Sequence, residues 1–190
     1  GALHMKRAEF AFNQQRPDEA AKYLDLAMNR FRLYEQIDPV FGPNYLRMGQ
    51  VYMIRKQYAE AAKVYENMIY APQCEVAPSL IQISWLRKTI LSYQSYVAAP
   101  GVAHPVHRHE TAEGYTNLAN AYFMLERMEE ADYAYRKALS LDPNHEMAKR
   151  NLQVLYSKAN AQGRLRKVEL PKDLGGVPTF TGYEIIPSKK

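Results

Sequence analysis

The sequence predicts an all-α fold in which helical hairpins stack side by side. The stretch that begins at Asn44 is repeated, with similar residue types, at an offset of seventy residues from Gly114. Within each copy, apolar residues recur every three or four positions, which is the period of an α-helix. Tiny residues also stand at matching places in both copies. Together these observations indicate pairs of closely packed helices.

The two copies agree at aromatic, apolar and tiny positions alike. The matching pairs are Tyr45 with Tyr115, Met48 with Leu118, Gly49 with Ala119, Tyr52 with Tyr122, Tyr58 with Met128, Ala61 with Ala131, Tyr65 with Tyr135 and Ile69 with Leu139. Each copy predicts two helices, with tight turns at residues 55–57 and 126–127. The tiny residues let the two helix backbones approach, and we expect larger residues there to overpack the contact.

This spacing resembles the tetratricopeptide repeat. The unit 112–145 carries the resemblance best, with Tyr115 at the aromatic position, Leu118-Ala119 for the Leu-Gly pair, and Asp142-Pro143 at the end of the second helix. The resemblance implies a short right-handed superhelix of about three repeats, one of them degenerate, followed by a capping helix.

On this resemblance we expect a helical repeat domain over 6–161. Its parts are units at about 6–41, 42–75 and 112–145, a degenerate unit at 76–111, and a capping helix at 146–161. The opening GALHM (1–5) is typical of a cloning remnant, so we expect the first unit to begin inside its first helix. The second helix of that unit is expected to run on to Asp38-Pro39, about two turns beyond the usual length.

Residues 76–111 have the length of one repeat without its pattern. The largely apolar stretch 78–97 begins at a proline and predicts one long helix. Residues 98–110 predict an irregular loop. Two interpretations stay open: a degenerate repeat whose second helix is short or lost, or a linker helix between two smaller arrays.

Composition and charge exclude several classes of protein. With 47% hydrophobic and 24% charged residues, the chain is not expected to be disordered. The net charge of +5 is spread over helix faces, which favours solvated surface over a nucleic-acid interface. Neither a membrane-spanning apolar run nor a signal peptide is visible, so we expect no membrane insertion. The compartment, cytoplasm or periplasm, stays open.

The sequence contains no motif that predicts catalysis or a bound cofactor. Phosphate-cradling loops, the G-x-S-x-G elbow and the His-Glu-x-x-His helix are all missing, so we expect no enzyme and no cofactor. Cys74 has no histidine near it in sequence that would activate it. The loop with His104, His107 and His109 is the one candidate metal cluster, but no cysteine or carboxylate pattern accompanies it. We therefore expect no metal site.

The resemblance implies a function in protein–protein interaction. In tetratricopeptide proteins the first helices of successive repeats line a concave groove, where extended peptides or partner helices dock. Carried over to this chain, the groove positions are Leu46, Gln50, Met53, Ile54, Thr116, Asn120, Phe123, Met124, Arg150 and Asn151. Apolar residues on an open face favour a docking surface. The alternative is that residues 76–111 or the tail cover this face.

One subclass of the family does not fit. Its chaperone-binding members hold a C-terminal carboxylate with asparagines and basic residues from successive repeats. Asn120 and Asn151 match that pattern, but Thr116 stands where the lysine belongs. We therefore do not expect recognition of heat-shock chaperone tails.

The tail, residues 162–190, is expected to be extended because prolines and glycines interrupt it. It carries Phe180, Tyr183, Ile185 and Ile186, and two interpretations stay open: the tail is disordered, or it folds back onto the array or self-associates with a neighbouring molecule. A second class of function also stays open. The chain could be an accessory domain of a larger bacterial protein, such as a membrane-associated glycan-processing enzyme.

Overall fold

The computed structural model describes residues 1–37, 41–70, 111–167 and 182–187. These residues form seven α-helices and one two-stranded sheet. The elements are α1 (Ala2–Asn13), α2 (Pro17–Ile37), α3 (Gly42–Ile54), α4 (Tyr58–Tyr70), α6 (Ala112–Met124), α7 (Met128–Leu141), α8 (Glu146–Ala161), β1 (Leu165–Lys167) and β2 (Tyr183–Ile185). The predictions for residues 76–110, including the helix over 78–97, Cys74 and the histidines of the 98–110 loop, lie outside the described residues.

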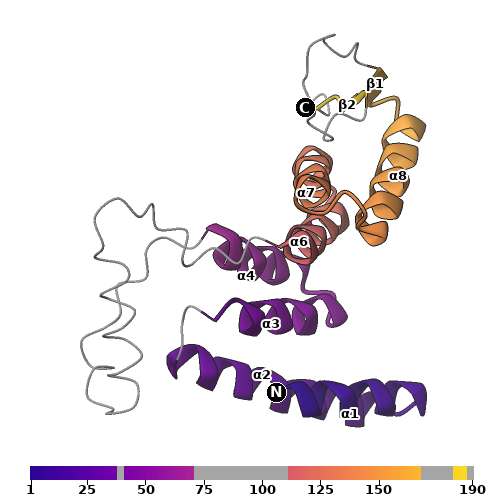
Figure 1. The fold of residues 1–190 in the computed structure, drawn as a ribbon. Helices are drawn as coiled ribbons and strands as arrows, with labels where there is room; N and C mark the ends of the chain where they lie inside the picture. Colours follow the sequence, from indigo (N-terminus) through magenta and orange to yellow (C-terminus); the bar gives the residue numbers. More distant parts are fainter. Residues whose placement is uncertain (38–40, 71–110, 168–181, 188–190) are drawn as a thin grey trace, which may run out of the picture.

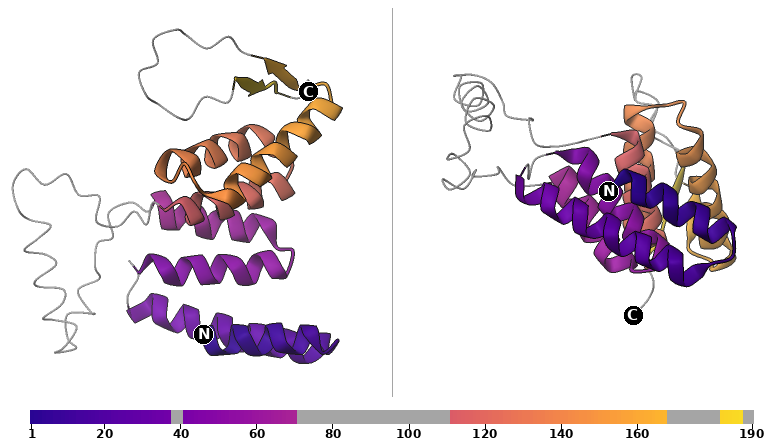
Figure 2. Two further views of the ribbon diagram at one scale, coloured as in Figure 1. Left: turned by 45° about the vertical axis from the view of Figure 1, so that its right-hand side comes forward. Right: turned by 90° about the horizontal axis from the view of Figure 1, so that it is seen from below.

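The helices form antiparallel hairpins that stack in sequence order (Figures 1 and 2). The hairpins are α1–α2, α3–α4 and α6–α7, and α8 packs on the last of them. Across each step of the stack a second helix meets the next first helix: α2 meets α3, α4 meets α6, and α7 meets α8. The predicted all-α architecture of stacked hairpins, with a non-helical tail, is therefore confirmed.

The first helix of each hairpin ends in the same backbone turn. The second residue after each of these helices takes a left-handed conformation. Its φ is 56° at Gln15, 58° at Lys56 and 60° at Glu126. The following amide then donates a hydrogen bond to a carbonyl in the last helical turn, which satisfies an otherwise unpaired helix end. These bonds run from Arg16 to Ala11, from Gln57 to Tyr52 and from Arg127 to Tyr122.

Helix α8 ends in the same turn, with Gly163 at φ 66° and the Arg164 amide 2.8 Å from the Ala159 carbonyl oxygen. The shared turn indicates that α8 stands where the first helix of another hairpin would stand. A strand follows it instead of a second helix.

The tiny residues are buried in the contacts between helices. Gly49 is buried in α3, and a β-carbon at this position would lie 2.2 Å from Cε1 of the Tyr65 ring in α4. Ala61 and Ala131 are also fully buried, each on the second helix of its hairpin. Ala8 of α1 is buried too and takes the place that Gly49 and Ala119 hold in the later hairpins.

The apolar core has two parts. The larger cluster joins α4, α6, α7 and α8 around Tyr65, Tyr115 and Tyr135. The smaller cluster joins α1, α2 and α3 around Leu24 and Met28. Helix α3 belongs to both, because Met48 packs into the smaller cluster and Leu46 into the larger.

The first hairpin differs from the others in length. Helix α2 has 21 residues, against 13 in α4 and 14 in α7, in line with the predicted extension. Its partner α1 has 12 residues because the helix begins at Ala2, so residues 2–5 continue the helical run of the sequence that follows them. The first helix of the α1–α2 hairpin is thus nearly as long as α3 and α6, which have 13 residues each.

The described part of the tail folds back onto the end of the array. Strands β1 and β2 pair antiparallel, with Leu165 opposite Ile185, and Ile185 is buried in the larger cluster. Arg164 fixes this arrangement: its Nε donates to the Ile186 carbonyl at 2.9 Å, and its Nη2 lies 2.7 Å from Glu129 Oε1 of α7. The short sheet therefore covers apolar surface at the end of the stack.

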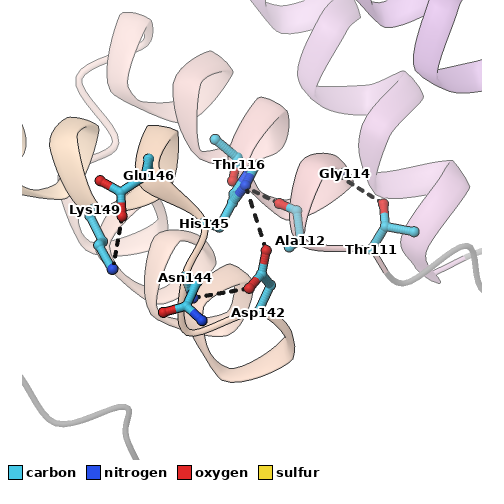
Figure 3. Close-up of polar contacts among 9 residues, drawn as sticks. All are labelled: Thr111, Ala112, Gly114, Thr116, Asp142, Asn144, His145, Glu146 and Lys149. Atoms are coloured by element: carbon cyan, nitrogen blue, oxygen red, sulfur yellow. Dashed lines mark hydrogen bonds and ion pairs between the residues drawn. The ribbon is translucent and has the colours of Figure 1, made fainter.

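Polar contacts define the ends of the last hairpin and the start of α8 (Figure 3). Thr111 Oγ1 accepts a hydrogen bond from the Gly114 amide at 3.0 Å, so it caps α6. Asp142 Oδ1 accepts from the Asn144 amide at 2.9 Å in the turn before α8. Lys149 pairs with Glu146 at 3.0 Å on the first turn of α8.

None of the described helices has the length and apolar character needed to cross a membrane.

The contact between Gly49 and Tyr65 predicts an unusual response to alanine. In a typical helix, Gly→Ala stabilises by about 1 kcal/mol. We expect Gly49→Ala instead to lower the free energy of unfolding by about 1–3 kcal/mol, because the fully buried Tyr65 ring must move. Urea denaturation monitored by circular dichroism measures the change. In a Tyr65→Leu background the same substitution should lose its cost, and a more stable Gly49→Ala single variant would contradict the packing described here.

Candidate protein-binding groove

The first helices of the hairpins contact one another along the stack, since α3 meets α6 and α6 meets α8. Between α1 and α3 the surface is hollowed. This hollow, the α1–α3 hollow below, is lined by Ala2, Met5, Lys6, Ala8, Glu9, Phe12, Asn13, Arg47, Gln50 and Ile54. Two of the predicted groove residues, Gln50 and Ile54, therefore lie together in it.

The α1–α3 hollow combines exposed apolar side chains with charges. Phe12 is 43% exposed and Ile54 is 47% exposed, from facing helices. Lys6, Glu9 and Arg47 stand around them. Arg47 Nη1 donates to Gln50 Oε1 at 3.0 Å, which orients the glutamine along α3. The hollow is therefore lined by apolar, polar and charged side chains together.

Asn120 and Asn151 lie side by side and join α6 to α8. Asn120 Oδ1 accepts from Asn151 Nδ2 at 2.8 Å and from the Tyr135 hydroxyl at 2.6 Å. Both asparagines are half-buried. Their hydrogen bonds give them a structural role, because they hold the capping helix against the last hairpin.

Phe123 and Met124 are the last two residues of α6, and their side chains lie in different environments. Phe123 is half-buried against the larger core cluster, and the Lys158 ammonium lies 4.9 Å from its ring centroid, a cation–π contact between α6 and α8. Met124 is 45% exposed. Arg150 is exposed on α8, and Met53 is half-buried against the larger cluster. Of these four, Met124 and Arg150 present the most surface.

Two of the predicted groove residues lie in the interior. Leu46 is 7% exposed and packs into the larger cluster. Thr116 is 1% exposed, and its hydroxyl donates to the Ala112 carbonyl of its own helix at 2.7 Å (Figure 3). Neither side chain is therefore open to a partner.

The α1 side of the hollow is missing from the sequence prediction. Lys6, Glu9, Phe12 and Asn13 line it, yet α1 was expected to be truncated, so its groove positions were not assigned. A signal for them exists in the sequence. Ala8 and Ala20 occupy the tiny positions of a complete hairpin, and aligning them with Gly49 and Ala61 places Phe12 opposite Met53 in the repeat pattern.

Among the described residues no group of histidine, cysteine, aspartate and glutamate side chains could hold a metal ion. The one buried carboxylate of this region, Asp132, accepts from the Tyr156 hydroxyl at 2.8 Å and pairs with Arg136. Burial raises the pKa of Asp132, and the Arg136 charge and the Tyr156 hydrogen bond oppose that shift. Asp132 thus links α7 to α8 in a structural contact.

Comparison with known proteins finds one match to a family model. Residues 112–145 match the family model described as tetratricopeptide repeat. Among solved structures, the chain is similar to the first TPR of Spaghetti (RPAP3) bound to the HSP90 peptide SRMEEVD, with 19% sequence identity over 84% of this chain and 92% of that chain and a TM-score of 0.47. It is also similar to the NMR structure of the first TPR domain of human RPAP3, with 20% identity over 85% and 92% and a TM-score of 0.44. No curated protein sequence matches the chain.

Tyr65 and Tyr135 hold the same repeat position but differ in the hydrogen bonding of their hydroxyl groups. Burial raises the pKa of both phenols above the usual range. The Tyr135 hydroxyl donates to Asn120, whereas the buried Tyr65 hydroxyl has no hydrogen-bond partner among the described residues. A buried polar group without a partner costs free energy that a hydrogen bond would recover.

We therefore expect the same substitution to act in opposite directions at these two sites. Tyr135→Phe should lower the free energy of unfolding by about 1 kcal/mol, and Tyr65→Phe should leave it unchanged or raise it by up to about 1 kcal/mol. Thermal or urea unfolding of the two variants, each the control for the other, measures the difference. Equal losses at both sites would show that the Tyr65 hydroxyl has a partner in solution.

Proposed function

We propose, from the premise that residues 112–145 are a tetratricopeptide repeat, that the chain is a non-catalytic protein-interaction adaptor. Its partner is an extended peptide segment held along the first helices α1, α3, α6 and α8. The observation that carries this proposal is the α1–α3 hollow, where Phe12 and Ile54 are exposed within one concave surface. Exposed apolar side chains gathered in a hollow are typical of a docking site.

The charges at the groove favour an acidic partner. Lys6, Arg47 and Arg150 form no ion pair with a carboxylate in the part of the chain that the structure describes. Glu9 is the single acidic residue among those that line the hollow. A peptide with carboxylates on either side of an apolar side chain would place that side chain against Phe12 and Ile54 and its charges near the cations.

Polar side chains along the groove can bind the peptide backbone. Gln50 Oε1 accepts from Arg47, which leaves the Gln50 amide nitrogen to donate to a peptide carbonyl. Asn120 Oδ1 likewise accepts two hydrogen bonds from its own chain, and its Nδ2 is proposed to donate to the peptide. Met124 and Met53 would add adaptable apolar contact between these two points. Self-association through the tail is not part of this proposal, because Ile185 is already buried in its own chain.

A selection from a synthetic peptide library tests the proposal. Peptides that bind the wild-type chain should combine acidic residues with a central apolar residue. The Phe12→Ser, Ile54→Ser double variant should bind them about tenfold or more weakly, because the apolar anchor loses its contact surface. Fluorescence polarisation with the selected peptides measures the dissociation constants.

Tyr133→Ser is the matched control, since Tyr133 is 55% exposed on α7 and does not line the hollow. Its affinity for the peptides should equal that of the wild type, and circular dichroism should show all variants folded. Undiminished binding by the Phe12→Ser, Ile54→Ser variant would contradict the groove as the binding site.

A further inference from the structure

Two amide side chains hold the same repeat position on neighbouring first helices. Gln50 of α3 and Asn120 of α6 are separated by the seventy-residue offset between the two copies of the repeat. Both residues are half-buried. In α1 the matching residue is Glu9, whose carboxylate accepts hydrogen bonds and does not donate them. The amide donors at this position of the three hairpins are therefore Gln50 and Asn120.

In both side chains the amide oxygen is engaged within the chain. Gln50 Oε1 accepts from Arg47 Nη1 at 3.0 Å. Asn120 Oδ1 accepts from the Tyr135 hydroxyl at 2.6 Å and from Asn151 Nδ2 at 2.8 Å. Turning either amide over would place its NH2 group against another donor, Arg47 or Asn151, so the oxygen stays inward.

The two amide nitrogens are consequently accessible donors with a fixed orientation. Neither Gln50 Nε2 nor Asn120 Nδ2 has a hydrogen-bond partner among the described residues, and neither belongs to the buried polar atoms that lack one. A site of this kind accepts a carbonyl or carboxylate oxygen and rejects an N–H group.

The packing of α3 against α6 sets the distance between these donors. The two helices are in contact, and packed helices lie about 8–10 Å apart. Side chains at the same repeat position leave their helices in the same direction. The two nitrogens are therefore separated by about 8–10 Å along the groove.

The spacing discriminates between the backbone conformations of a partner. An α-helix uses its carbonyl groups internally. A β-strand turns carbonyls to one side at every second residue, about 6.8 Å apart, or about 13.6 Å at every fourth, and neither value matches. A polyproline II segment has three residues per turn, each rising about 3.1 Å, and no internal hydrogen bonds. Its carbonyls three residues apart point the same way at a separation of about 9.3 Å, which matches.

An apolar side chain stands beside each donor. Met53 follows Gln50 by three residues and Phe123 follows Asn120 by three, so each apolar residue is on the same helix face as the donor. Both are half-buried, so part of each side chain is accessible. Apolar and aromatic side chains beside hydrogen-bond donors are the surroundings in which polyproline II segments are held.

We propose that the part of the groove over α3 and α6 binds a proline-rich peptide in the polyproline II conformation. Carbonyls three residues apart accept hydrogen bonds from Gln50 Nε2 and Asn120 Nδ2. Proline favours this conformation, and its missing N–H group costs nothing at two sites that only donate. This inference rests on the proposed function and adds the backbone conformation and the composition of the partner.

Two synthetic peptides with the same charges and the same central leucine test the conformation. Acetyl-PEPPLPPEP-amide favours polyproline II, and acetyl-TEVTLTVET-amide favours a β-strand. We expect the first to bind the wild-type chain about tenfold or more tightly than the second, because its carbonyls already match the two donors. Isothermal titration calorimetry measures both dissociation constants. The proposal is overturned if the second peptide binds as tightly as the first, or if neither binds.

The substitutions Gln50→Glu and Asn120→Asp test the two donors. Each keeps the oxygen that its neighbours bind and replaces only the outward NH2 group by an acceptor. Each should weaken binding of the proline-rich peptide about tenfold or more, measured in about 0.5 M salt, where charge repulsion is screened. Gln153→Glu is the matched control, since Gln153 is exposed on α8 and the change adds the same charge. It should bind the peptide like the wild type, and circular dichroism should show all variants folded.

Failure of this inference differs from failure of the proposed function. Undiminished binding of the proline-rich peptide by both donor variants overturns the inference. The Phe12→Ser, Ile54→Ser variant decides the proposed function by itself. Library-selected peptides that need Phe12 and Ile54, but neither amide donor, would leave the proposed function standing and overturn the polyproline II site.

Discussion

The architecture depends on how closely the two helices of a hairpin can approach. At Gly49 there is no room for a β-carbon, since the Tyr65 ring occupies that space, and Ala61 lies buried on the facing helix. Because protein interiors are close-packed, the Tyr65 ring fits between the two helices of its hairpin only because the facing residue has no side chain. Tyr115, Leu118 and Tyr135 belong to the larger core cluster and are almost fully buried. The tiny and the aromatic positions are thus two halves of one packing arrangement, repeated along the stack.

The two halves of the array use their polar groups differently. In the C-terminal half, Asn120, Asn151 and Tyr135 form a hydrogen-bonded group, and Asp132 with Tyr156 forms a second link between α7 and α8. Asn120 Oδ1 and the Asp132 carboxylate are therefore already engaged within the chain. In the N-terminal half, the concave surface is open between α1 and α3, with Phe12 and Ile54 exposed. The proposed groove is therefore open between α1 and α3, and hydrogen bonds join α6 to α8 at its other end.

The end of the array shows how a stack can close without another hairpin. Helix α8 ends in the turn used by α1, α3 and α6, but the chain then enters β1. Arg164 stands at that transition and holds both the Ile186 carbonyl and Glu129. The two strands cover the last apolar surface with very few residues, and Ile185 provides the buried contact. An unclosed end would leave apolar surface in water, which repeat arrays avoid by capping.

The sequence by itself determined the hairpins, their turns at 55–57 and 126–127, the long α2 and the capping helix, because helical period and tiny positions are local patterns that packing reinforces. It also predicted a groove along the first helices of the hairpins. Only the tertiary structure decided which groove positions are open: Leu46 and Thr116 are buried, Asn120 is engaged by Tyr135, and the α1 residues Phe12 and Glu9 join the surface. The reason is that exposure depends on what the neighbouring helix contributes, and that neighbour is distant in sequence.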